Sequence, residues 1–383
     1  MTTTINNEHK KLNVPNLRFK EFQGEWEKTK FGDIATGFDY GMNAAAKNYD
    51  GVNKYIRITD IDEASSTYTD KDIVSPDGIL TDNYLVNNRD ILLARTGAST
   101  GKSYLYKKSD GNLYYAGFLI RANVTTHDPY FVFSQLHTHR YWRWVSIMSA
   151  RSGQPGINSQ EYSSFPIYTT SIEEESKIAK LLSLLDERIA TQNKIIDKLQ
   201  SLIKGLRVRL VQIEKGNIVH LNEIASIYQP QTISSTELTE DGFCVYGANG
   251  IIGKYKDYNH KTEQICITCR GNTCGMVNYT KPMSWITGNA MVINTDEYQN
   301  KVCKRYLFHY LSAYNFNHII SGSGQPQIVR TPLEQLKITL PTVLEQEQKA
   351  MFLDKIQCEI EIGNRILSLY MQQKQYLLRQ MFI

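Results

Sequence analysis

The sequence predicts an α+β protein in which two tandem mixed α/β domains are separated by two long helices that form an antiparallel coiled coil. Three observations indicate this fold class. The 383-residue chain carries the same plan twice, each copy has a glycine-rich loop after an apolar strand, and each copy ends in a long helical stretch with a heptad pattern. We therefore expect a pseudo-twofold internal repeat.

The repeat is defined most clearly by two Gly-Gln-Pro segments. ARSGQPGI in the first half matches SGSGQPQI in the second, and Gln154 and Gln325 lie 171 positions apart (325 − 154). The same offset takes Gly117 to Gly288. Upstream, FGDIAT and ILLARTGASTG in the first copy match LNEIAS and ICITCRGNTCG in the second, with offsets shifted by insertions.

The first glycine-rich loop, RTGASTGKSY at 95–104, shares residues with a phosphate-binding loop. That motif needs four residues between its first glycine and the Gly-Lys-Ser/Thr, whereas Gly97 leaves only three before Gly101. The second copy has an arginine, Arg270, and both glycines, but Met-Val in place of Lys102-Ser103. We therefore predict a shared structural turn and not a nucleotide site.

Each copy ends in a stretch with a coiled-coil seam. In the first, apolar residues recur in alternating steps of four and three, with one gap at Gln192, and in the second the gap falls on Gly363. Helices of roughly 40 residues would span about 60 Å, and neither can expose such a stripe alone. We expect them to pair with each other rather than to pack separately on their own domains. The predicted seam comprises Ile178, Leu182, Leu185, Ile189, Ile196, Leu199, Leu353, Ile356, Ile360 and Leu367.

Composition limits the class of protein. A formal net charge of +4 tolerates nucleic acid as a partner without requiring it. The polar start and the absence of a run of about 18 apolar residues predict a cytoplasmic protein without membrane association. Cys266 and Cys269 lie in an expected strand, where positions three apart face opposite sides, so structural thiols are favoured over a zinc site. We predict no metal site.

Motifs for catalysis on DNA are missing from the sequence. HDPYFVF contains Asp128-Pro129-Tyr130 but lacks the second proline of the tetrapeptide that adenine methyltransferases use, so we interpret it as a turn. Pro76-Asp77 is not followed by the Glu-x-Lys pair of a nuclease. Neither motif is therefore complete in this sequence.

The chain resembles the specificity subunits of type I restriction–modification systems. The resemblance is carried by VPNLRFKEFQGEWEKTKFGDIA, by the paired Gly-Gln-Pro loops, and by the helical stretches beginning IEEESKIAKLLSLLDERIATQNK and VLEQEQKAMFLDKIQCEIEIGNR; it covers essentially the whole chain. It implies two target recognition domains that each read one half of a split double-stranded DNA site, with helices that set the spacing and dock two methyltransferase subunits. Translocase/nuclease subunits would complete the assembly. S-adenosylmethionine, ATP and Mg²⁺ are expected only on these partner subunits, and this subunit would have no catalysis or cofactor of its own.

The resemblance and the repeat together predict the domain organisation. We expect an N-terminal arm at 1–25, a first target recognition domain at 26–170, a central long helix at 171–215, a second target recognition domain at 216–341 and a C-terminal long helix at 342–383.

Candidate DNA contacts are residues whose side chains suit base edges or phosphates and that lie in turns which the repeat places equivalently. Arginine and lysine suit guanine, whereas asparagine and glutamine suit adenine. Arg95 and Arg270 are favoured because both are expected at the same strand end, while the two Gly-Gln-Pro loops have the alternative role of turning the chain toward the helix. The divergent stretches 39–55 and 229–258 are a further candidate for specificity. The full set is Arg95, Lys102, Tyr104, Arg151 and Gln154 in the first domain, and Asn249, Lys254, Arg270, Asn272 and Gln325 in the second.

A scaffold is the alternative function. An antiparallel rod can space two protein-binding heads as readily as two DNA-reading heads. Salt separates the two hypotheses, because a DNA reader loses affinity steeply as the salt concentration rises.

Overall fold

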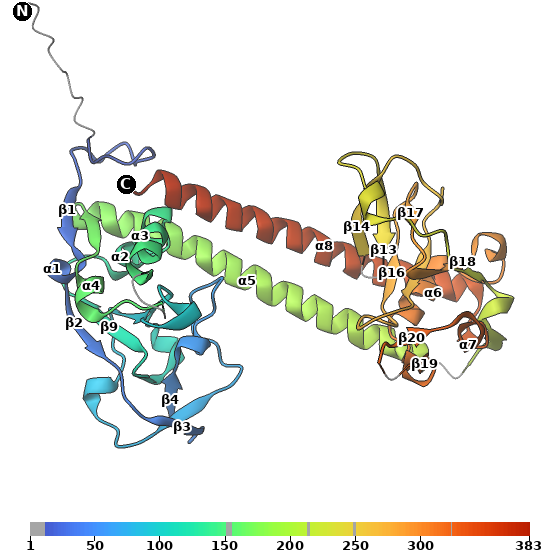
Figure 1. Cartoon of the computed structure of the whole chain (residues 1–383), viewed down its shortest axis with the longest axis horizontal. Coiled ribbons are helices and arrows are strands. Elements are labelled where there is room, and N and C mark those ends of the chain that lie inside the picture. Colours follow the sequence, from blue (N-terminus) through green and yellow to red (C-terminus); the bar gives the residue numbers. More distant parts are fainter. Residues whose placement is uncertain (1–11, 151–154, 213–214, 248–249, 323) are drawn as a thin grey trace, which may run out of the picture. The chain divides into compact units, whose positions relative to one another are not determined.

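The computed structural model describes residues 12–150, 155–212, 215–247, 250–322 and 324–383. The chain divides into two compact units: unit 1 is Met1–Gln192 with Leu367–Ile383, and unit 2 is Asn193–Ile366. Each unit contains part of both long helices, α5 (Ile172–Val211) and α8 (Val343–Gln380). Figure 1 shows α5 passing from unit 1 into unit 2 and α8 returning from unit 2 to unit 1.

Unit 1 is built around a four-stranded antiparallel sheet with the order β2-β9-β6-β7. Two further antiparallel pairs, β1–β10 and β3–β5, and one parallel pair, β4–β8, surround this sheet. The strands are β1 (Glu27–Lys30), β2 (Ala35–Tyr40), β3 (Ala45–Asn48), β4 (Asn53–Ile56), β5 (Val74–Asp77), β6 (Asp90–Ala94), β7 (Ser103–Leu105), β8 (Asn112–Tyr115), β9 (Leu119–Val124) and β10 (Pro166–Thr169). The short helices are α1 (Phe31–Ile34), α2 (Pro129–Gln135), α3 (His139–Ser149) and α4 (Ser159–Ser163).

Unit 2 repeats the main features of this topology and adds two antiparallel pairings, β13 with β14 and β19 with β20. Its four-stranded sheet has the order β12-β18-β15-β16, β11 pairs antiparallel with β21, and β13 pairs parallel with β17. The elements are β11 (Asn217–His220), β12 (Ser226–Tyr228), β13 (Phe243–Gly247), β14 (Gly250–Tyr255), β15 (Ile265–Thr268), β16 (Val277–Tyr279), β17 (Trp285–Ile286), β18 (Ala290–Asn294), α6 (Lys304–Leu311), β19 (Ile320–Ser321), β20 (Gln327–Ile328), α7 (Arg330–Glu334) and β21 (Lys337–Leu340). The predicted duplication of a mixed α/β fold is therefore confirmed.

The central strands are apolar throughout because both of their faces are covered. Side chains alternate along a strand, and in β6 Ile91 and Leu93 join a core with α2, α3 and the long helices, whereas Leu92 and Ala94 join a second core. A strand that is buried on both faces reads as a continuous apolar run. This explains why ILLA precedes the first glycine turn.

The two long helices run antiparallel within each unit, as predicted. In unit 1 the start of α5 lies against the end of α8, where Leu377 and Met381 share a core with Leu182, and Lys374 forms a 2.6 Å ion pair with Asp186. In unit 2 the end of α5 meets the start of α8, and Arg207 donates to Gln357 at 3.3 Å. Seven of the predicted seam residues are buried and three are half-buried: Ile178, Leu182, Leu185, Ile196, Leu353, Ile356 and Ile360, and then Ile189, Leu199 and Leu367.

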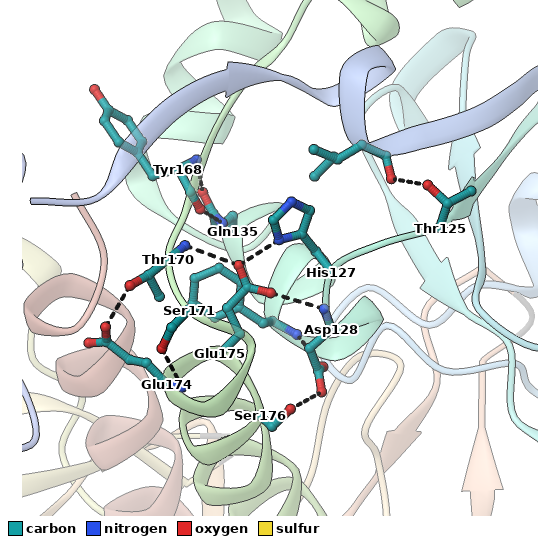
Figure 2. A network of polar contacts seen from close by, with 12 residues as sticks. Thr125, His127, Asp128, Gln135, Tyr168, Thr170, Ser171, Glu174, Glu175 and Ser176 are labelled. Carbon is teal, nitrogen blue, oxygen red and sulfur yellow. Dashed lines mark hydrogen bonds and ion pairs between the residues drawn. The ribbon is translucent and has the colours of Figure 1, made fainter. Parts of the chain in front are cut away.

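A polar network fixes the start of α5 to the rest of unit 1 (Figure 2). The buried carboxylate of Glu175 accepts hydrogen bonds from the backbone N–H groups of Thr170 (3.1 Å) and Asp128 (3.0 Å), and its other partner is the His127 ring at 2.9 Å. Glu174 is also buried and pairs with Arg18 through two contacts of 2.7 Å. Carboxylates in the first turn of a helix are stabilised by the helix dipole, so the acidic run at the start of α5 serves the junction.

The same junction in unit 2 uses a neutral amide. Gln346 accepts from the Cys303 backbone N–H at 2.9 Å and donates to the carbonyl of Pro341 at 2.9 Å. Asp128 and Cys303 are equivalent because each is the N-cap of its helix, α2 and α6 respectively. The interpretation of Asp128-Pro129 as a simple turn is corrected: Asp128 caps α2, and Pro129 occupies the first helical position, where its missing N–H costs nothing.

Candidate nucleic-acid interface

The two glycine-rich loops have the same backbone geometry. In unit 1, Gly101 N donates to Ala94 O (3.0 Å) and Ala94 N donates to Lys102 O (2.8 Å). In unit 2, Gly275 N donates to Thr268 O (2.9 Å) and Thr268 N donates to Met276 O (2.8 Å). All four glycines, Gly97, Gly101, Gly271 and Gly275, have positive φ, which favours glycine at each position. The loops are one structural turn used twice.

Each glycine turn is held against its Gly-Gln-Pro loop by equivalent hydrogen bonds. Gly97 N donates to Pro155 O (3.0 Å) in unit 1, and Gly271 N donates to Pro326 O (2.9 Å) in unit 2. These segments are far apart in the sequence, yet their backbones pair beside the end of the central strand. The proline of each Gly-Gln-Pro segment thus accepts a hydrogen bond from the glycine turn in both units.

The two candidate arginines both follow the equivalent strands β6 and β15, but they occupy neighbouring positions and not the same one. Ile157 N donates to Arg95 O (2.9 Å), whereas the matching bond in unit 2 runs from Ile328 N to Cys269 O (3.0 Å). Cys269 is therefore the counterpart of Arg95, and Arg270 is displaced by one residue. Consecutive residues of an extended chain point to opposite sides, so the two arginines are presented differently.

The side chain of Arg95 is half-buried and lies over an aromatic ring. Its guanidinium carbon is 4.6 Å from the centre of the Tyr40 ring, a cation–π contact. The counterpart Cys269 is fully buried, and its thiol lies 3.1 Å from the Gln229 side-chain amide. Tyr40 and Gln229 lie in the divergent stretches of the two copies. Tyr40 is not among the predicted candidates, because these were chosen from loops that the two copies share.

The other unit 1 candidates differ in accessibility. Lys102 is half-buried and forms a 3.2 Å ion pair with Glu63. Tyr104 is fully buried, its hydroxyl donates to Asp110 at 2.5 Å, and burial raises its pKa far above the ordinary value of a tyrosine. A side chain without exposed surface cannot reach a base edge, so Tyr104 is a core residue and is withdrawn from the candidates. Arg151 and Gln154 lie outside the described residues.

Unit 2 presents an exposed cluster of candidates. Arg270, Asn272 and Gln325 are all exposed, and the backbone of Arg270 pairs with that of Gln327 next to the Gly-Gln-Pro loop. Among the described residues, the side chains of these three candidates make no hydrogen bond or ion pair with one another or with any other group. Lys254, in β14, is also exposed. Unlike these three residues, it has a partner, because it forms a 3.3 Å ion pair with Asp241. Asn249 lies outside the described residues.

The structure also describes the cysteines, the possible metal ligands and the character of the helices. Cys266 and Cys269 are buried free thiols, and burial raises the pKa of the Cys266 thiol well above its usual value. Within the described ranges, no group of three or more His, Cys, Asp or Glu side chains is arranged to hold a metal ion. No described helix combines the length and the apolar character needed to cross a membrane.

Comparison with known proteins identifies the family. The family model "Type I restriction modification DNA specificity domain" matches residues 23–201 and again 214–369. The MjaVIII type I restriction enzyme specificity subunit of Methanocaldococcus jannaschii is 26% identical over an alignment of 405 positions, gaps included, which covers 91% of each protein. The EcoprrI specificity subunit of Escherichia coli is 27% identical over 176 residues, and this match spans 46% of the present chain and 38% of that protein.

Solved structures share the fold. The type I restriction–modification S subunit from M. genitalium has a TM-score of 0.71 at 16% identity, with 97% of this chain and 99% of that chain covered. A chain from a structure of type I restriction–modification complex assembly has a TM-score of 0.54 at 14% identity, with 93% and 97% covered.

The duplicated α/β units and the duplicated family match define a DNA sequence-specificity subunit. The chain belongs to the type I restriction–modification DNA specificity domain family. Subunits of this family are non-catalytic and carry no cofactor of their own.

Proposed function

We propose that residues 26–170 and 216–341 are two target recognition domains, each of which reads one half of a bipartite double-stranded DNA site. The proposal rests mainly on one observation. Both units build the same glycine turn and Gly-Gln-Pro junction from the same backbone hydrogen bonds, but they place different side chains on it, with Arg95 and Tyr40 in unit 1 and Arg270 and Asn272 in unit 2. Two readers of different half-sites need a common scaffold and different base contacts.

The exposed unit 2 cluster is suited to direct readout. The guanidinium of Arg270 and the amides of Asn272 and Gln325 are hydrogen-bonding groups of the kinds that recognise guanine and adenine in the major groove. Because these side chains have no partner among the described residues, they would not have to break an existing contact before binding DNA.

The long helices would dock two methyltransferase subunits and set the spacing of the half-sites, and translocase/nuclease subunits would complete the complex. S-adenosylmethionine, ATP and Mg²⁺ would be bound by those partners. Apolar side chains on the exposed faces of the helices support this part of the proposal: Met351 and Phe352 of α8 are 57% and 56% exposed within unit 2, and Leu369 and Tyr376 are exposed within unit 1. Clustered exposed apolar residues mark interaction surfaces.

A methylation map tests the proposal. The chain is expressed with its companion methyltransferase in a host that lacks adenine methylation, and modified adenines are located across the genome. We expect methyladenine at one split motif with two short specified halves and a fixed gap. The companion methyltransferase expressed alone is the control, and we expect no such motif there.

The opposite outcome has a clear meaning. If the two chains co-purify and the companion methylates the same sites with and without this subunit, target reading is excluded. A protein-binding scaffold, which shares the duplicated architecture, would then be the function.

A further inference from the structure

A second turn beside the central strand is equivalent in the two units. In unit 1, Leu119 N donates to Ala116 O at 2.8 Å and closes a turn that carries Phe118. In unit 2, Ala290 N donates to Thr287 O at 3.0 Å and closes the matching turn, which carries Asn289. Phe118 and Asn289 thus occupy the same position on the same backbone.

Both turns lie directly against the strand end of the candidate interface. Arg95 N donates to Phe118 O at 3.0 Å, and its counterpart Cys269 N donates to Asn289 O at 3.3 Å. The strand end is also where the Gly-Gln-Pro loop pairs. Position 118 or 289 is therefore next to the residues proposed to contact bases.

The backbone of the unit 1 turn is tightly held. Met42 N donates to Tyr115 O (2.8 Å), and Gly117 N donates to Met42 O (2.9 Å). A Cβ on Gly41 would lie 2.3 Å from Ala116 O, so only glycine permits this close approach. A side chain on such a turn is presented on a rigid base, which reduces the entropy lost on binding.

The side chains themselves point away from the fold. Phe118 is 59% exposed, and Asn289 is exposed and makes no side-chain hydrogen bond among the described residues. One exposed apolar residue is ordinary on a protein surface. The distinctive feature here is that the same turn presents an apolar ring in one unit and a free amide in the other.

We infer that this turn is a second base-reading position in both units: Phe118 contacts the 5-methyl group of a thymine in one half-site, and Asn289 contacts the edge of an adenine in the other. Apolar side chains recognise the thymine methyl group, and asparagine pairs with N6 and N7 of adenine in the major groove. The inference rests on the proposed function, since it assigns a role within the two DNA-reading units.

The test removes single groups from the DNA. The complex of the full chain with its methyltransferase is bound to duplexes carrying the mapped site, and each thymine position of the half-site read by unit 1 is replaced in turn by deoxyuridine, which lacks only the methyl group. We expect the wild type to lose affinity roughly fourfold at one position, the value of one buried methyl group. The Phe118→Ala complex should bind the thymine and deoxyuridine duplexes equally at that position, and Phe118→Leu should keep part of the difference.

Asn289 supplies the matched control in the other unit. Replacing adenine by 7-deazaadenine in the half-site read by unit 2 removes the N7 acceptor. The wild type should lose affinity at one such position by roughly 5- to 150-fold, and the Asn289→Ala complex should be insensitive there. Each variant should leave the other half-site unaffected.

The result that overturns the inference is distinct from failure of the proposed function. If the wild-type complex binds the mapped site but Phe118→Ala weakens the thymine and deoxyuridine duplexes in equal proportion, or changes nothing, the turn does not read the methyl group. Failure to bind any split site would instead reject the proposed function. Melting of each variant complex shows whether a uniform loss of binding comes from unfolding, and the thymine and deoxyuridine duplexes are compared with the variant, Phe118→Ala or Phe118→Leu, that melts as the wild type does.

Discussion

Arg270 combines an exposed guanidinium with a backbone that is fixed on both sides. Its backbone pairs with that of Gln327, and the next residue, Gly271, donates to Pro326 at 2.9 Å. The fixed backbone sets the direction in which the Arg270 side chain leaves the turn, and no existing contact has to be broken before it binds. Such a residue suits bidentate recognition of guanine, where geometry determines the discrimination.

We expect Arg270→Ala to weaken binding at the half-site of unit 2 and to leave the other half-site unchanged. Loss of one bidentate base contact corresponds to roughly a 5- to 150-fold loss of affinity. Competition binding with each half-site scrambled in turn measures the effect. Arg330→Ala is the matched control, because Arg330 already pairs with Glu334 at 2.7 Å, and a uniform loss over all sequences in Arg270→Ala would point to a phosphate contact instead.

The residue scale is also where prediction from sequence was weakest. Tyr104 and Lys102 follow the same glycine turn, but Tyr104 is enclosed by a core that includes Leu113 and Tyr115. Arg95 and Arg270 each follow an apolar strand, but the alignment of ILLARTGASTG with ICITCRGNTCG offsets them by one position, and the backbone hydrogen bonds show the same offset. Accessibility depends on strands from distant parts of the chain, so no local pattern contains it.

At the scale of elements, the two head–helix junctions use different chemistry at equivalent positions. Glu175 and His127 form the junction in unit 1, and Gln346 takes the place of the carboxylate in unit 2. The hydrogen bond to Glu175 raises the pKa of His127 above its ordinary value of 6.5, against the opposing effect of burial. The unit 1 junction is therefore sensitive to pH in a range where an amide is not.

The sign of the pH dependence follows from the raised pKa. Protonated His127 is favoured in the folded state, so its contribution to stability is fully present below the unfolded pKa of about 6.5 and is lost as pH rises through the folded pKa. We expect the backbone amide of Asp128, which donates to Glu175, to be less protected at pH 8 than at pH 6 once intrinsic exchange is corrected. Hydrogen exchange measures this protection.

Two controls accompany this measurement. The amide of Cys303, which donates to Gln346, should show a flat profile, and His127→Gln should flatten the profile of Asp128. Equal protection of Asp128 at both pH values in the wild type would contradict the prediction.

At the scale of the whole chain, the end of α8 supplies part of the core of unit 1. Leu377, Leu378, Met381 and Phe382 join Trp26 in the core of unit 1, so this core depends on residues more than 350 positions apart (382 − 26). The N-terminal segment contributes as well, because Leu17 N donates to Gln380 O at 2.8 Å. The folding of unit 1 therefore requires α8 to return to it.

Leu185→Asp tests this dependence. Leu185 is 6% exposed in the unit 1 core, and an unpaired buried carboxylate costs on the order of several kcal/mol. We expect a lower melting temperature, faster hydrogen exchange in 377–382 and loss of methylation at the split site. The neighbouring Leu184 is 42% exposed, so Leu184→Asp should leave the melting temperature unchanged. If both variants lowered the melting temperature equally, the assignment of Leu185 to the core of unit 1 would be refuted.

The sequence by itself determined the duplication, the two long helices with their seam, and the shared glycine turn. These features depend on local chemistry: heptad spacing specifies a helix face, and glycine specifies positive φ. Only the tertiary structure decided which side chains reach the surface, because Phe118, Arg95 and the Gly-Gln-Pro loop are brought together by pairing between strands and loops that are separated in the chain. The physical reason is that a side chain is buried by the elements packed against it. Those elements come from other parts of the chain, so the sequence around a residue does not say whether it is covered.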